Sequence, residues 1–174
     1  IQNRTSFMKL EDTNVFRLDS IYEDVVLTAE GFNADFDNNG SMQYSLVLCD
    51  GFVQKRASGK KTGMPILYYK ARAGLTFQDY QDAGVISDDV YNFMDNANIL
   101  NLGVPDDSTI RHPLHPDAGI PNPNGFAAFE NMILNTEVLP IRRPFRADSY
   151  ILVSAGKDGL YGTSDDIVNF KRAE

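Results

Sequence analysis

The chain has 174 residues, a length at which one domain can bury about two-thirds of the surface of its unfolded state. Hydrophobic residues make up 43% and charged residues 23%, which predicts an ordinary folded domain and excludes a fibrous or wholly disordered one. The formal net charge of -8 disfavours nucleic acid and anionic lipid as partners, because both carry negative charge. The sequence contains no run of 18 apolar residues, which is the length that would predict a membrane-spanning helix.

Cys49 is the only cysteine, so an internal disulfide and a thiolate zinc site are both excluded. It follows the apolar run at residues 46–48, and we therefore expect a buried, unreactive thiol. The sequence starts at Ile1 and not at Met, so we expect the natural protein to begin upstream, with an export or anchoring segment there.

The N-terminal part predicts a helix, a turn and a strand in that order. Apolar residues recur at three- and four-residue steps over residues 6–29, as an amphipathic helix requires. The acidic turn at residues 35–40 then leads into a strand over residues 42–49. This turn begins like an EF-hand loop, but Leu46 stands where a bidentate glutamate belongs, so we expect a plain turn.

A second strand is predicted over residues 64–71, with Pro65 near its start, where a missing amide donor does least harm. A short basic cluster lies before it and is interrupted by small residues. We expect this cluster to form a solvated loop; its members are Lys55, Arg56, Lys60 and Lys61.

Residues 74–138 are rich in Asp, Asn, Pro and Gly, and they predict an insertion of loops and short helices. One helix is expected from the N-cap Ser87 to about residue 94, with acids in its first turn. Another is expected over residues 125–134, where four apolar side chains share one side: Phe126, Phe129, Met132 and Ile133.

The sequence offers no constellation typical of catalysis. Neither a Ser-His-Asp order with a nucleophile elbow nor a Cys-His pair is present, and acidic pairs such as Asp106 and Asp107 are typical of caps and turns. His112 and His115 alternate with prolines, so we expect an extended surface loop there and not a metal site. We expect no enzymatic activity; a hydrolase using acids of the insertion stays an alternative.

The last part of the chain predicts a central strand over residues 149–154, a loop, and a short antiparallel strand over residues 167–170. Calcium prefers six to eight oxygen ligands on a chain that can bend around it. The loop supplies carboxylates, hydroxyls and glycines together. The residues alone leave two alternatives open, a calcium loop or a Gly-rich hairpin whose acids face water.

Residues 150–170 resemble the C-terminal end of type II secretion pseudopilins, most of all the major pseudopilin, and of related proteins with a prepilin-type N-terminal cleavage and methylation segment. The shared pattern is Ser-x-Gly-x-Asp-Gly-x-x-Gly, then Asp-Asp-Ile. Residues 65–71 are similar to the strand that follows the Trp-Gly-x-Pro turn of that family. Here Gly63 and Pro65 are kept, but the chain has no Trp, no apolar N-terminal helix, and a longer insertion.

The resemblance implies an α+β, pilin-like fold: one extracytoplasmic domain over residues 1–174, with a truncated N-terminal helix packed on a small antiparallel sheet. The insertion would occupy residues 74–138, and the last strand and a calcium loop would occupy residues 150–170. It also implies a Ca²⁺ ligand set, with side chains of three acids and two backbone carbonyls: Asp158, Asp165 and Asp166, with Leu160 and Thr163.

The function that the resemblance implies is that of a structural subunit of a type II secretion pseudopilus or a related pilin-like filament. Such a protein is anchored in the bacterial inner membrane through its N-terminal helix, lies in the periplasm, and serves protein secretion. Its partners are other pseudopilin subunits and the secretion machinery. The alternative is a secreted or surface binding module for a carbohydrate or protein ligand, stabilised by calcium in the same loop.

Overall fold

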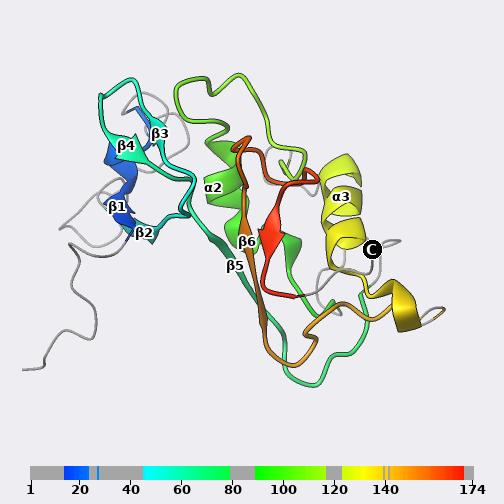
Figure 1. Ribbon diagram of the computed structural model, residues 1–174. Coiled ribbons are helices and arrows are strands. Elements are labelled where there is room, and N and C mark those ends of the chain that lie inside the picture. The colour runs from blue at the N-terminus through cyan, green and yellow to red at the C-terminus, as the bar shows by residue number, and fades with distance from the viewer. Residues whose placement is uncertain are drawn as a thin grey trace, which may run out of the picture.

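We describe the protein from a computed structural model, which defines residues 14–23, 27, 45–78, 89–116, 123–138, 140 and 142–170. The fold is mixed α+β, with small antiparallel sheets and a few short helices (Figure 1). Within the described ranges, none of the helices combines the length and the apolar character that crossing a membrane requires.

The N-terminal described segment forms a strand where a helix was predicted. β1 (Val15–Arg17) pairs antiparallel with β2 (Leu46–Leu48), and the 3₁₀ helix η2 (Leu18–Ser20) follows. The helix expected over residues 6–29 is therefore wrong in its middle, because the backbone of residues 15–17 bonds to β2. The acidic turn at residues 35–40 and the start of the expected strand over 42–49 lie outside the described residues.

A small hydrophobic cluster holds this end of the molecule together. It comprises Leu18, Ile21, Tyr22, Leu27, Cys49 and Leu102. Burial, with a smaller contribution from the neighbouring Asp50 carboxylate, raises the pKa of the Cys49 thiol to about 12. The expectation of a buried, unreactive thiol is confirmed.

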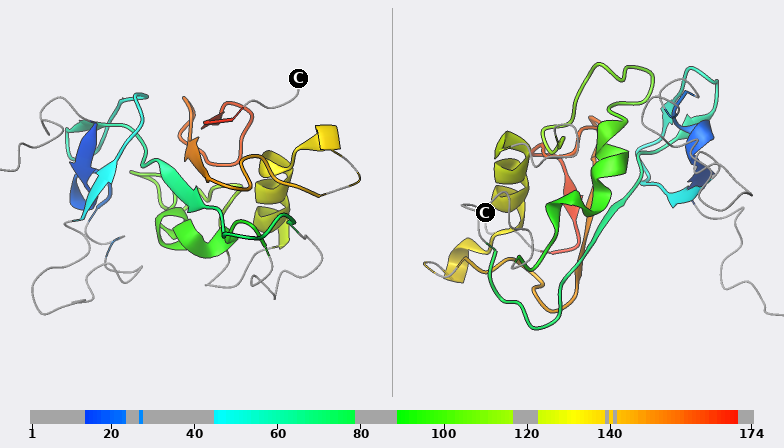
Figure 2. Two further views of the ribbon diagram at one scale, coloured as in Figure 1. Left: turned by 90° about the horizontal axis from the view of Figure 1, so that it is seen from below. Right: turned by 180° about the vertical axis from the view of Figure 1, so that it is seen from behind.

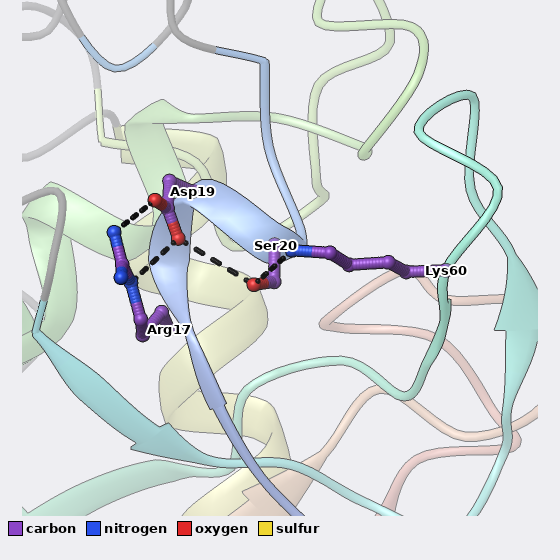
Figure 3. Close-up of polar contacts among 4 residues, drawn as sticks. All are labelled: Arg17, Asp19, Ser20 and Lys60. Carbon is purple, nitrogen blue, oxygen red and sulfur yellow. Dashed lines mark hydrogen bonds and ion pairs between the residues drawn. The ribbon is translucent and has the colours of Figure 1, made fainter.

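The hairpin of β3 (Gln54–Lys55) and β4 (Lys61–Thr62) contains the basic cluster. Arg56 is only 4% exposed, and its guanidinium donates to the hydroxyl and carbonyl oxygens of Thr62, so the expectation of a wholly solvated cluster is wrong. At the surface, Lys60 Nζ donates to the Ser20 hydroxyl at 2.9 Å, next to the ion pair of Arg17 and Asp19 (Figure 3).

The main sheet has three strands in the order β5-β6-β7: β5 (Leu67–Lys70), β6 (Tyr150–Ser154) and β7 (Ile167–Val168). Both pairings are antiparallel, with Leu67 opposite Val153 and Ser154 opposite Ile167. This confirms the predicted central strand over residues 149–154 and the antiparallel return after the loop.

Helices occur in the described parts of residues 74–138: η5 (Phe93–Asn96), α2 (Ala97–Asn101), α3 (Pro123–Ile133) and η6 (Thr136–Val138). The expected helix over residues 125–134 is confirmed as α3. The expected helix at 87–94 is wrong over its described part, because the Asn92 side chain caps the Met94 amide and starts η5 later. Ser87 lies outside the described residues.

The main core lies on one face of this sheet. Alternation along β5 and β6 sends Leu67, Tyr69, Ile151 and Val153 into it. The helices η5, α2 and α3 cover this face (Figure 2). The Tyr69 ring centroid lies 4.7 Å from that of Phe129 of α3. The opposite face carries exposed side chains, among them Tyr68, Lys70 and Tyr150.

Phe129→Ala should lower the free energy of unfolding by about 3–5 kcal/mol, because a fully buried ring is replaced by a cavity. Phe52→Ala is the matched control, since Phe52 is 37% exposed, and it should cost less than about 1 kcal/mol. Urea unfolding followed by circular dichroism measures both. Equal losses in the two variants would contradict the placement of the core.

Candidate metal centre

The predicted site is the loop of residues 155–166, which leaves the central strand β6 and returns as β7. Both ends of the loop are therefore held by the same hydrogen-bonded sheet, and Ser154 at its start faces Ile167 at its end. The Ser154 hydroxyl also donates to the buried Asp50 carboxylate at 2.7 Å, which ties the start of the loop to the chain after β2.

Asp165 is the acceptor that closes the loop. Its Oδ2 accepts the backbone amides of Lys157 at 2.8 Å and Asp158 at 3.1 Å, while its Oδ1 accepts the Thr163 hydroxyl at 2.6 Å. The Thr163 hydroxyl and these amides favour the charged form, and they lower the pKa of Asp165 to about 2. The carboxylate therefore stays ionised at every physiological pH.

The other two predicted carboxylates accept local amides. Asp158 Oδ1 accepts the amide of Leu160 at 2.8 Å, and Asp166 Oδ2 accepts the amide of Gly162 at 2.7 Å. Of the two predicted carbonyl ligands, that of Leu160 lies 3.3 Å from the Thr163 hydroxyl, whose one proton goes to the nearer Asp165. That of Thr163 accepts the Asp166 amide at 3.5 Å. The five predicted ligands thus lie in one loop, and four of them accept hydrogen bonds within it.

Two glycines of the loop stand where no other residue fits. Gly156 has a φ of 62°, and a Cβ there would lie 2.4 Å from the carbonyl oxygen of Asp165. Gly162 has a φ of 98°, and a Cβ there would lie 2.9 Å from Pro113 and 3.0 Å from Leu114. The first glycine permits the two ends of the loop to meet, and the second permits the loop to pack against residues 113–114.

Tyr161 was missed as a functional residue by reasoning from sequence. Its side chain is fully buried in the main core, and its hydroxyl donates to the carbonyl of Pro65. Its carbonyl accepts the amide of Leu114 at 3.2 Å. An aromatic residue alone amid Gly, Asp, Thr and Ser was the available signal, because a loop fully in water has no need for one.

The two histidines are buried, so the expectation that they lie in an exposed loop is wrong. His112 Nε2 donates to the carbonyl of Gly103 at 3.0 Å, and its Nδ1 accepts the amide of Tyr161 at 3.4 Å, which requires the neutral ring. Burial lowers the pKa of His112 to about 4, and the nearby His115 adds to the effect. His112 therefore helps to hold Tyr161, the residue that fixes the loop in the core.

The donor atoms of the loop match calcium in their chemistry but not in their arrangement. All five predicted ligands present oxygen atoms, which is the chemistry that calcium prefers. Yet Asp158 and Asp166 point their bonded oxygens at different amides, and among the described residues no three His, Cys, Asp or Glu side chains gather closely enough to hold a metal. The loop fits calcium in chemistry, and side-chain rotation would be needed to assemble the site.

Space for such a rearrangement lies beside the loop. A cavity of about 300 Å³ separates it from α3, and Thr163 and Asp166 are among its lining residues. The helix contributes Ala128, Asn131 and Met132 to the same cavity. Two of the five predicted ligands therefore border open volume and not packed side chains.

Comparison with protein-family models, with curated proteins and with solved structures finds no match to this chain.

Gly156→Ala should destabilise the protein by at least about 1–3 kcal/mol, because its positive φ and the Asp165 carbonyl both oppose a Cβ. Gly51→Ala is the control, since nothing lies within 4 Å of the new methyl group. Thermal unfolding of the two variants in chelator measures the difference. A Gly156→Ala variant as stable as Gly51→Ala would show that the loop is not closed as described.

The folded protein should lose stability between pH 6.5 and about 4, because only the unfolded chain protonates His112 in that window. The full effect is on the order of 3 kcal/mol, present above pH 6.5 and lost as pH falls. Urea unfolding at pH 7 and pH 5 measures it, and His112→Gln should flatten the profile. If His112→Gln keeps the pH dependence of the wild type, the loss of stability comes from another titrating group.

Proposed function

We propose that this chain is the extracytoplasmic domain of a structural filament subunit of the type II secretion pseudopilin kind, and that it assembles and does not catalyse. The observation that carries the proposal is the agreement of residues 150–170 with the C-terminal pattern of that family, in a loop that joins a central strand to an edge strand. The mixed α+β fold is compatible with it.

In this proposal the loop holds Ca²⁺ through the side chains of Asp158, Asp165 and Asp166, with the carbonyls of Leu160 and Thr163. Three carboxylates within nine positions of one loop repel one another when the loop closes, and the effect grows as solvent is excluded. A divalent cation supplies the opposing charge. Its binding energy then adds to the stability of the loop, because the unfolded chain offers no such site.

The remaining parts of the proposal follow from the same likeness. The protein would be anchored in the bacterial inner membrane by an N-terminal apolar helix upstream of Ile1, and the domain would lie in the periplasm. Its partners would be further copies of itself and the secretion machinery. A filament subunit needs a C-terminal region that keeps its shape under load, and Tyr161 and Asp165 serve that need.

Calcium should raise the melting temperature of chelator-treated protein by about 5–10 °C when its concentration is about 100 times the dissociation constant. Asp158→Asn with Asp166→Asn should remove that gain and preserve the stability in chelator, because each amide oxygen can still accept the same backbone bond. Differential scanning calorimetry measures both states, and magnesium serves as the control ion.

The same double variant tests whether the calcium site is needed for filament assembly. Expressed in the natural host from the full-length gene, it should yield fewer filaments in electron micrographs and less exported protein than the wild type. If calcium does not change the melting temperature, the metal site is wrong. Normal secretion by cells that lack the gene would remove the filament function.

A further inference from the structure

A groove lies away from the loop, at the end of the main sheet where the chain leaves β5 and enters β6. This end of the two strands is at the bottom of Figure 1. Its volume is about 580 Å³, within the range of ligand-binding sites. Small side chains form part of its lining, among them Ala71, Ala73, Gly74 and Ala147. Nothing in the proposed filament function uses this groove.

The charge of the groove is opposite to that of the whole chain. Lys70, Arg72 and Arg143 line it, against the single carboxylate of Asp148, in a protein whose net charge is -8. The side chains of Lys70 and Arg143 are exposed, and in the part of the chain that the structure describes neither has an ion-pair partner. Burial raises the pKa of Asp95, and the charge of Arg72 offsets a part of that rise.

Two exposed aromatic rings border the cations. Tyr68 and Tyr150 lie diagonally across β5 and β6, with Lys70 directly opposite Tyr150. Their ring centroids are 5.7 Å apart, and they are 48% and 42% exposed. Tyr and Arg are among the residue types enriched at protein–protein interfaces, because they combine apolar area with polar or charged groups.

We propose that this groove binds an acidic peptide segment of a partner protein. Glutamate or aspartate side chains of the segment would pair with Arg143 and Lys70, and its apolar atoms would pack on Tyr68 and Tyr150. The three cations of the groove against one carboxylate favour an acidic occupant, and a second copy of this chain in that place is an outcome that the test below distinguishes. The inference is independent of the filament function and of calcium.

The test is fluorescence anisotropy of a labelled peptide of about six glutamates, titrated with the wild-type protein in low salt. Lys70→Glu with Arg143→Glu should weaken binding at least about tenfold, and Tyr68→Ala should weaken it about threefold or more. Lys55→Glu with Lys61→Glu is the matched control, because it changes the net charge equally at an exposed pair outside the groove. That control should retain most of the wild-type affinity.

Four outcomes would overturn the proposal. They are the absence of peptide binding, equal weakening by the groove variant and its control, binding of a galacturonate oligosaccharide in place of the peptide, and self-association that the groove variant abolishes. Circular dichroism of each variant verifies that it is folded. An unfolded groove variant is replaced by Lys70→Gln with Arg143→Gln, which keeps hydrogen-bonding capacity, and for which at least about threefold weakening is expected.

Discussion

The burial of Tyr161 is the interaction on which the C-terminal half of the structure depends. The ring is enclosed in the main core, and its hydroxyl reaches the carbonyl of Pro65, next to β5. Its backbone bonds to the segment of His112 and Leu114. One side chain in the middle of a polar loop therefore joins three stretches that are distant in sequence. The acids on either side of it are held at fixed places in the loop as a result.

Asp165 performs a different task from Tyr161, because it closes the loop on itself. A carboxylate offers about four lone-pair positions, and three of them already accept hydrogen bonds from Lys157, Asp158 and Thr163. A cation bound here would share this carboxylate with the amides and would not replace them. Calcium would then reinforce a loop that hydrogen bonds have already shaped, and most of its effect would fall on Asp158 and Asp166.

The main sheet has two unlike faces, and the proposed roles separate along them. One face is packed against the helices, with Tyr69 and Phe129 in contact, and it provides stability. The other face exposes Tyr68 and Tyr150 beside cations in an otherwise acidic protein. In the filament subunit that we propose, the end loop would keep the shape of the domain, and the open face would be the place of contact with a partner.

The sequence by itself predicted the central strand, its antiparallel return, helix α3 and the buried Cys49, because each depends on local periodicity or on one residue's chemistry. It also placed the candidate ligands in one loop, since they are neighbours along the chain. Tertiary structure decided the rest. Residues 15–17 form a strand because β2 lies beside them, and His112 is buried where its ring accepts the amide of Tyr161, which is far from it in sequence. Such partners are brought together only by folding, and no pattern local to the sequence encodes them.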